Sequence, residues 1–211
     1  MIKEYRNSEG FKITEQQVIH MDGNYQIYNY EPTTLFLQEI INYEKDEIFQ
    51  VKYFKKDSEN ENDIINYLST KNFFFLITSK EVFGSFIVCT VKSVNTKKGG
   101  LLGIEKEVYE ISDTECKYLI CGQGCDKQTL QPILGSTLKF IYSFDDYGNG
   151  EKVQGVKFTY KTNGELNLAV DMTPDYNNHK NWDEYTLANF QELQDLFPWD
   201  ISYYKNANLL P

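Results

Sequence analysis

A strong hairpin turn, Thr162-Asn163-Gly164, separates two runs of strand-forming residues, Val153–Tyr160 and Leu166–Val170. Asn-Gly supplies the left-handed backbone conformations that tight hairpin turns require. Within the second run, apolar side chains alternate in a way that predicts one buried face, made of Leu166, Leu168 and Val170. These features predict an antiparallel sheet in the second half of the chain.

Short runs rich in β-branched and aromatic residues predict strands elsewhere in the chain. We expect Asp22-Gly23-Asn24 to join the first two of them as a second hairpin. The predicted strands are Gln17–Met21, Tyr25–Tyr30, Ile48–Phe54, Phe73–Thr78, Val82–Val94, Glu107–Ile111, Cys116–Cys121 and Thr137–Phe144.

Two helices are expected in the first half. Pro32 suits a first helical turn, so we expect a helix from there to about Tyr43, although a strand also fits the mixed spacing of the apolar residues. A short helix is predicted around Ile64–Leu68 because its apolar residues recur at helical spacing. Ser58 and Glu61 have the spacing of a capping box at its start.

A third helix is predicted near the C-terminus, from about Trp182 to Phe197. Asn181 and Glu184 have the spacing of an N-cap and its partner, and Pro198 marks the stop. The helix is expected to be amphipathic, with an apolar stripe of Leu187, Phe190, Leu193 and Phe197. Together these elements predict an α+β protein with a mainly antiparallel sheet and a few helices.

The clearest loop is Thr96-Lys97-Lys98-Gly99-Gly100. These lysines and glycines separate two strand-forming regions, as is typical of a loop that connects two strands. We expect residues 1–211 to form a single domain with a candidate subdomain seam at 96–103, because neither half shows a self-contained order of elements.

The chain is acidic, with a formal net charge of −10. This balance argues against a nucleic-acid-binding surface, since such surfaces are basic. The charge is uneven: residues 1–100 carry 12 basic and 14 acidic side chains, whereas residues 101–211 carry 9 and 17. An acidic face on the second half is therefore expected, although surplus carboxylates also serve solubility alone.

No apolar run approaches the roughly 18 residues that a membrane helix needs. The segment Met1–Arg6 lacks the apolar core of a signal peptide. We therefore expect a soluble, cytoplasmic protein that does not bind membranes.

The four cysteines are Cys89, Cys116, Cys121 and Cys125. In a cytoplasmic protein they are expected to be free thiols, buried and inert. A metal site is not expected, because Cys116 and Cys121 would point to opposite faces of one strand. The acidic segment Asp145–Glu151 is predicted to be a turn, since its spacing does not match a calcium loop.

No motif in the sequence defines a reaction, and no cofactor is expected. His179 lies in the densest polar cluster, Asp171–Glu184, which fits a loop leading into a helix. Gly122-Gln123-Gly124 is expected to be a tight turn. An alternative function nevertheless stays open: a small-ligand-binding protein or a hydrolase-type enzyme, with a scattered site near His179 or near Cys121 and Cys125.

The first functional hypothesis is a non-catalytic acidic protein that docks onto a basic protein and neutralises it. Its profile is similar to that of immunity proteins against bacterial toxins, which are small, acidic, motif-poor and built of α+β elements. Carboxylates would supply electrostatic complementarity, and aromatic residues would anchor the interface. The predicted partner-binding residues are Asp171, Asp175, Asp183, Glu184, Trp199 and Tyr203.

Overall fold

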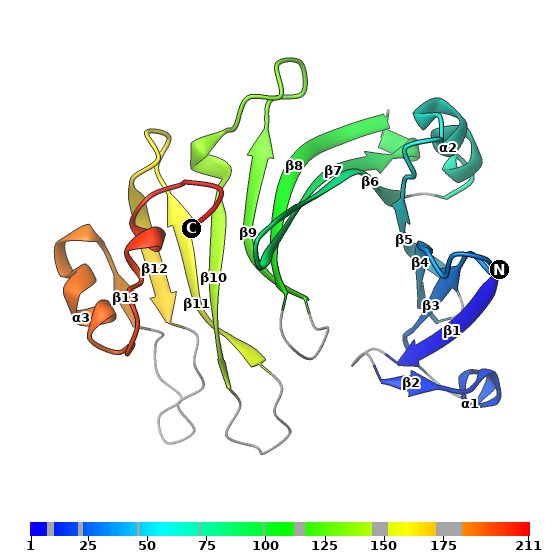
Figure 1. Ribbon diagram of the computed structural model, residues 1–211, viewed down its shortest axis with the longest axis horizontal. Coiled ribbons are helices and arrows are strands. Elements are labelled where there is room, and N and C mark those ends of the chain that lie inside the picture. The colour runs from blue at the N-terminus through cyan, green and yellow to red at the C-terminus, as the bar shows by residue number, and fades with distance from the viewer. Residues whose placement is uncertain are drawn as a thin grey trace. The chain divides into compact units, whose positions relative to one another are not determined.

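The structure is a computed structural model of the 211-residue chain (Figure 1). It describes residues 1–7, 11–20, 23–45, 47–71, 73–98, 100–111, 117–144, 152–171 and 183–211. These residues form two compact units. Unit 1 comprises Met1–Lys80 and Cys89–Ile104, and unit 2 comprises Glu81–Val88 and Glu105–Pro211.

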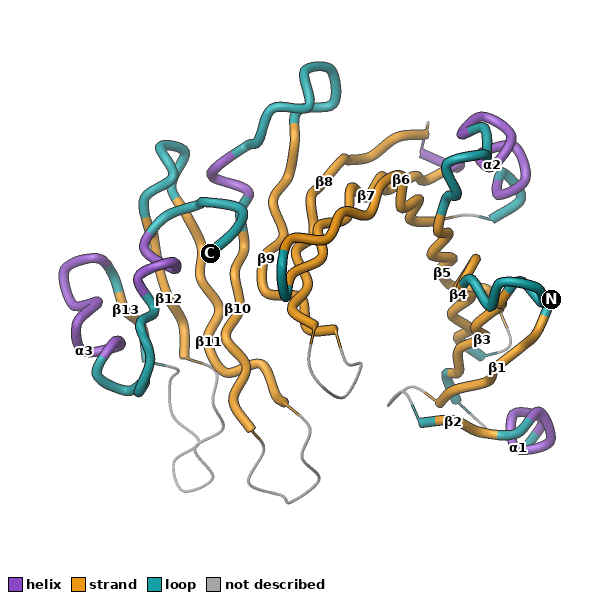
Figure 2. Tube along the Cα trace, viewed as in Figure 1, coloured by secondary structure: helices purple, strands orange, loops and turns teal. Residues whose placement is uncertain are grey.

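Strands make up most of the regular structure, as the orange segments of Figure 2 show. The strands are β1 Ile2–Asn7, β2 Lys12–Ile13, β3 Tyr25–Tyr30, β4 Leu37–Glu44, β5 Glu47–Phe54, β6 Phe73–Phe83, β7 Phe86–Asn95, β8 Gly100–Ile111, β9 Lys117–Cys125, β10 Leu138–Phe144, β11 Lys152–Tyr160, β12 Leu166–Asp171 and β13 Glu184–Tyr185. The helices are α1 Glu15–Ile19, α2 Glu61–Leu68 and α3 Phe190–Gln194, with short 3-10 turns η1 Thr96–Lys98, η2 Leu134–Ser136, η3 Leu187–Asn189 and η4 Ser202–Lys205. The predicted class, mainly antiparallel β with few helices and one near the C-terminus, is confirmed.

In unit 1 the strands follow the order β2-β1-β3-β4-β5-β6. Every pairing is antiparallel except β5 with β6, which is parallel because α2 carries the chain back between them. The Asn60 side chain caps α2 by accepting a hydrogen bond from the backbone N–H of Asn62. The predicted cap at Ser58 is therefore wrong by two residues. The core of this unit consists of Val51, Tyr53, Ile64, Leu68, Phe74, Leu76 and Val94.

In unit 2 the order is β9-β10-β11-β12-β13, antiparallel throughout. Figure 1 shows β10, β11 and β12 side by side. The predicted hairpin at Thr162-Asn163-Gly164 is confirmed, and Gly164 adopts a φ of 86° there. The main core consists of Ile141, Val156, Phe158, Tyr160, Leu166, Ala169, Phe190, Leu193, Ile201 and Ala207.

Strands β6, β7 and β8 each contribute residues to both units. The range 96–103 contains η1 and then Gly100, whose φ is 101°. The single domain with a seam at 96–103 stays a prediction.

The hairpin expected at Asp22-Gly23-Asn24 is wrong, because Gln17–Ile19 belongs to helix α1 rather than to a strand. Thr14 and Gln17 form a capping box: the Thr14 hydroxyl accepts from the Gln17 amide at 3.2 Å, and the Thr14 amide donates to the Gln17 side chain at 2.7 Å. Strand β3 pairs instead with β1 and β4. Met21 and Asp22 lie outside the described residues.

The helix expected from Pro32 to Tyr43 is also wrong. Leu37–Glu44 is strand β4, paired on one side with β3 and on the other with β5. Leu35 adopts a φ of 55°, which ends a right-handed helical run, and the β-branched pair Ile40 and Ile41 favours a strand.

The C-terminal helix starts later and is shorter than predicted. Glu184 and Tyr185 form β13 against β12, so Glu184 is not a capping residue. Thr186 provides the capping box for η3, and α3 follows directly. Asn181 and Trp182 lie outside the described residues.

Two glycine positions were misinterpreted from the sequence. Gly84, with a φ of 60°, forms a turn with Ser85 that divides the expected strand Val82–Val94 into β6 and β7. Gly122-Gln123-Gly124 is not a turn but part of β9. A Cβ atom on Gly124 would lie 2.5 Å from Ser136 Oγ, so glycine there permits close approach of η2.

The predicted buried face of β12 is corrected by a β-bulge. The register shifts between Thr159 and Tyr160, so Asn167 has no residue opposite it in the β11 register, although its side chain donates to the Thr159 hydroxyl at 3.4 Å. Leu166 and Ala169 are therefore buried, whereas Leu168 and Val170 are only half-buried.

In the part of the chain that the structure describes, no helix is long and apolar enough to cross a membrane.

Candidate functional site

Three predicted partner-binding carboxylates lie at the β12–β13 pair of unit 2. Asp171 ends β12, and its backbone N–H donates to the Asp183 carbonyl at 2.9 Å. Glu184 begins β13 and pairs with Val170. Asp183 and Glu184 are exposed and Asp171 is half-buried, so the structure brings these three residues together at one strand pair. Asp175 lies outside the described residues.

Tyr185 lies within electrostatic reach of two of these carboxylates, Asp171 and Asp183, and of Glu192. Burial raises the pKa of the Tyr185 hydroxyl, and the charges of Asp183, Asp171 and Glu192 raise it further. Carboxylates from β12, the approach to β13 and α3 therefore lie within electrostatic reach of one hydroxyl group. We call Asp171, Asp183 and Glu192 the carboxylate surface; Glu184, the neighbour of Tyr185 along β13, points to the opposite face of the sheet.

Asp183, Glu184 and Glu192 lie in a segment that has few basic residues. Within the described ranges, no lysine or arginine forms an ion pair with Asp183, Glu184 or Glu192. Lys205 is the one basic residue in Asp183–Pro211, and its ammonium nitrogen lies 4.9 Å from the centre of the Phe190 ring. The negative charges of Asp183, Glu184 and Glu192 are therefore available to a cationic partner.

Trp199 is an exposed aromatic residue that is nevertheless held in place. Its side chain is 53% exposed, and its ring packs against Phe197 with centroids 5.2 Å apart. Phe197 and Tyr185 both pack against the main core of unit 2. Gln194 fixes the loop, because its side chain donates to the Trp199 carbonyl at 2.7 Å and accepts from the Ile201 amide at 3.0 Å. A rigid, exposed aromatic ring is the usual anchor of a protein interface.

Tyr203, the last predicted partner-binding residue, is half-buried and belongs to a cage around Lys139. The Lys139 ammonium nitrogen lies 3.3 Å from the centre of the Tyr203 ring and within 6 Å of the Tyr160 and Tyr204 rings. The Tyr203 hydroxyl donates to the Leu209 carbonyl at 2.8 Å. Its ring therefore has a structural role inside unit 2, whether or not a partner also touches it.

Lys139 is fully buried and ties the C-terminal segment to β10. Its ammonium group donates to the carbonyls of Tyr203 at 2.9 Å and Asn206 at 2.8 Å. Burial lowers its pKa to about 7, an effect that the neighbouring Cys121 opposes. Gln123 adds a further buried tie by donating to the Ala207 carbonyl at 2.7 Å.

A pocket of about 270 Å³ lies beside this segment. Gln123 and Cys125 line it from β9, Lys106 lines it from β8, and Leu130 and Pro132 contribute apolar surface. Burial raises the pKa of the Cys125 thiol, and Lys106 opposes that effect. This is a small concave site with one thiol, which is the feature that the alternative function requires.

The remaining candidates for catalysis or metal binding are the cysteines, the histidines and the acidic segment Asp145–Glu151. Cys89, Cys121 and Cys125 are buried, as predicted, whereas Cys116, His179 and Asp145–Glu151 lie outside the described ranges. His20 lines an open pocket of about 780 Å³ with Ile13, Thr14 and Ile19. Among the described histidines, cysteines and carboxylates, no three lie close enough to hold a metal ion.

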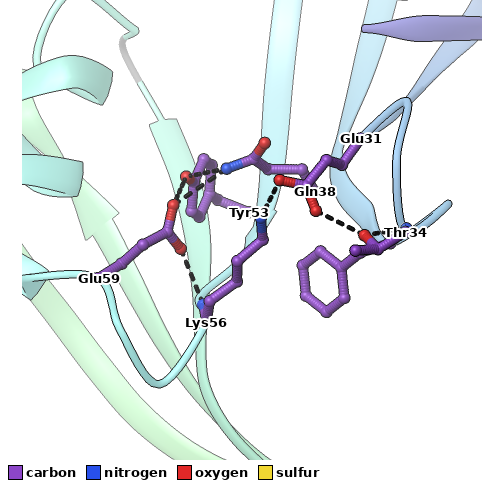
Figure 3. Close-up of polar contacts among 7 residues, drawn as sticks. Glu31, Thr34, Gln38, Tyr53, Lys56 and Glu59 are labelled. Carbon is purple, nitrogen blue, oxygen red and sulfur yellow. Dashed lines mark hydrogen bonds and ion pairs between the residues drawn. The ribbon is translucent and has the colours of Figure 1, made fainter.

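Unit 1 carries a separate polar network around Tyr53 (Figure 3). The Tyr53 hydroxyl donates to Glu59 at 2.8 Å, and the Gln38 amide donates to both the Tyr53 hydroxyl and Glu59. Lys56 donates from its backbone to Glu59 and from its ammonium group to Glu31, at 2.8 Å and 2.6 Å. Burial and the Glu59 contact raise the pKa of Tyr53 far above its usual range.

Comparison with known protein families, curated protein sequences and solved structures gave no match. The candidate sites therefore rest on the geometry of this chain alone.

The sequence did not predict a role for two residues of these sites, Glu192 and Lys139. Glu192 is predicted on a helix, but nothing in the sequence places it, together with Asp171, within electrostatic reach of Tyr185. Lys139 carried a usable signal, because it alternates in phase with Ile141 along β10, and a lysine in phase with a core residue points to a buried position.

Proposed function

We propose that this chain is a non-catalytic binding protein whose carboxylate surface docks onto a basic protein. The observation that supports the proposal is that Asp171 and Asp183, which a backbone hydrogen bond of 2.9 Å joins, lie with Glu192 within electrostatic reach of one residue, Tyr185. Such a group of like charges attracts a partner that supplies lysine or arginine opposite it. The exposed ring of Trp199 would supply apolar anchoring in the same segment of the chain.

In its specific form, the proposal is an immunity protein that acts in the cytoplasm and neutralises a basic toxin. Helix α3 would serve as an amphipathic support, because it buries Phe190 and Leu193 while Glu192 is exposed. The partner-facing residues in the described chain would be Asp183, Glu184 and Trp199, with Asp171 and Tyr203 contributing from half-buried positions.

Affinity capture with three matched proteins tests the proposal. The first is the unaltered chain, the second carries Asp183→Lys and Glu184→Lys, and the third carries Glu44→Lys and Glu47→Lys. Both variants change the net charge by the same amount at exposed positions, but only the second alters the carboxylate surface. A basic protein retained by the first and third but lost by the second supports the proposal. Equal retention by all three contradicts it.

Trp199→Ala provides an independent test of the apolar anchor. If Trp199 is buried in the complex, its removal should raise the dissociation rate and weaken binding by about 2 kcal/mol or more. The matched control is Phe49→Ala on β5, which removes another exposed aromatic ring from the chain. Equal losses for the two variants would show that Trp199 is not an anchor.

The pocket beside Cys125 supports a second candidate function, the binding of a small ligand. Ligand-observed NMR with a fragment collection, on the unaltered protein and on Cys125→Ser, tests this. Fragments that compete with one another and lose binding in Cys125→Ser would favour it. Fragment binding that is unchanged in the variant would rule out this pocket as the site.

A further inference from the structure

Asn29, Glu39 and Tyr53 form a row across three neighbouring strands of unit 1. Asn29 on β3 pairs with Glu39 on β4, and Glu39 pairs with Tyr53 on β5. Asn29 and Glu39 are each only 4% exposed. A buried carboxylate is costly unless a cation or several hydrogen-bond donors compensate it.

The pair is only partly satisfied from within the described chain. Asn29 Nδ2 donates to Glu39 Oε1 at 2.9 Å, and Asn29 Oδ1 is buried with no hydrogen-bond partner among the described residues. The amide cannot be turned round, because its oxygen would then face the carboxylate. Both Asn29 Oδ1 and the Glu39 carboxylate therefore remain directed to accept hydrogen bonds.

The row is flanked by tyrosine rings. Tyr67 on α2 packs edge-on against Tyr53, with ring centroids 6.4 Å apart, and its side chain is 57% exposed. Burial raises the pKa of Tyr67 and of Tyr43, and the charge of Glu39 raises both further, which places Glu39 within electrostatic reach of both rings. Tyr53 gives its own hydroxyl hydrogen to Glu59 (Figure 3). The Tyr53 hydroxyl group therefore does not donate a hydrogen bond to Glu39.

We propose that Glu39 and Asn29 bind the primary ammonium group of a ligand, with Tyr53 and Tyr67 forming its aromatic walls. A primary ammonium carries three N–H donors, which suit two carboxylate oxygens and one amide oxygen. Tyrosine faces attract a desolvated cation, so the walls add to the charge of Glu39.

Other cations fit this row less well. A quaternary ammonium has no N–H for Asn29 Oδ1, and a guanidinium brings five donors to a smaller number of acceptors. The described residues here provide one carboxylate and one amide oxygen, fewer ligands than a divalent metal requires. This site lies in unit 1, so it goes beyond the proposed function of the carboxylate surface in unit 2.

Isothermal titration of the full-length protein with n-butylammonium chloride tests the proposal. The controls on the same protein are tetramethylammonium chloride, which keeps the charge without N–H donors, and 1-butanol, which keeps the chain without the charge. Binding of n-butylammonium alone supports the proposal. Equal binding of all three probes, or binding of none, overturns it, and this comparison needs no substitution.

Glu39→Gln should weaken n-butylammonium binding by about tenfold or more, because it removes the charge that faces the ammonium. Glu44→Gln removes the same charge from an exposed position on the same strand and should leave binding unchanged. Equal affinity in the Glu39→Gln and Glu44→Gln proteins would overturn the proposal. If Glu39→Gln does not fold, the three-probe comparison on the unaltered protein decides.

Two sources can supply the ammonium group, a free alkylamine or a lysine side chain of a protein. Nα-acetyl-lysine methylamide distinguishes them, since it presents the side chain together with peptide groups. Binding at least as tight as that of n-butylammonium identifies a protein lysine, and loss of binding identifies a free amine. Because this assay needs no protein partner, its outcome is independent of capture through Asp183 and Glu184.

Discussion

The ammonium nitrogen of Lys139 lies 2.9 Å from the backbone oxygen of Tyr203 and 3.3 Å from the centre of the same residue's ring. One buried cation thus contacts both the main chain and the side chain of a single residue in the C-terminal segment. The arrangement fixes that segment against β10. It also makes the stability of unit 2 sensitive to the charge of Lys139.

The Lys139 charge should make stability rise with pH. Burial holds its pKa at about 7 in the folded protein, below the 10.5 of an ordinary lysine, so between these values the unfolded chain binds one more proton. The free energy of unfolding, measured relative to Lys139→Met, should therefore increase from pH 7 to pH 9 by about 2 kcal/mol. Urea unfolding of both proteins at several pH values measures this difference. A constant difference across the window would show that Lys139 titrates normally.

The upper limit of that window has a physical reason. Burial raises the pKa values of Tyr160, Tyr203 and Tyr204, and also that of the Cys121 thiol. These groups stay protonated in the folded protein while they ionise in the unfolded chain, so above about pH 9 they lower stability.

Gly124→Ala should destabilise the protein by about 1–3 kcal/mol, because the added methyl group would overlap Ser136 Oγ at 2.5 Å. Ser136→Ala removes that oxygen, although the Ser136 Cβ still lies 3.2 Å from the added atom. The double variant should therefore recover part of the loss. Denaturant unfolding of the two single variants and the double variant gives the coupling energy. Strictly additive effects would show that the two residues do not meet.

Calorimetry should show one unfolding transition for the full chain. Three strands, β6, β7 and β8, each place residues in both compact units, so neither unit is made of one continuous piece of chain. Separating them would interrupt hydrogen-bonded strands, which couples their unfolding. Two resolved transitions, or stable folding of residues 105–211 alone, would contradict the single domain.

The sequence predicted best where one local signal dominated. Asn163-Gly164 defined the β11–β12 hairpin, and the polar break before Ile64 located α2. Prediction from the sequence failed where two local signals favoured different structures. Around Thr14 a capping box outweighed the hairpin signal at Gly23, and along Leu37–Glu44 pairing on both sides outweighed the helical start at Pro32.

The candidate sites were less predictable than the fold, because they depend on contacts between distant segments. Asp183 and Glu184 stood out by charge density, yet nothing local links them to Asp171 or to Tyr185. The row of Asn29 and Glu39 depends on strand register, whereas the residues around Glu39 predict a helix. Register is set by pairing across the sheet, which a single segment does not encode.

The association rate between this protein and the basic partner captured through Asp183 and Glu184 tests the central claim most directly. It should be measured for the unaltered chain, the Asp183→Lys/Glu184→Lys variant and the charge-matched Glu44→Lys/Glu47→Lys variant, at ~0.05 M and ~0.5 M salt. The account predicts that at low salt only the first variant associates about tenfold or more slowly, and that high salt removes most of this difference. Equal association rates for the two variants at low salt, or rates that do not respond to salt, would contradict it.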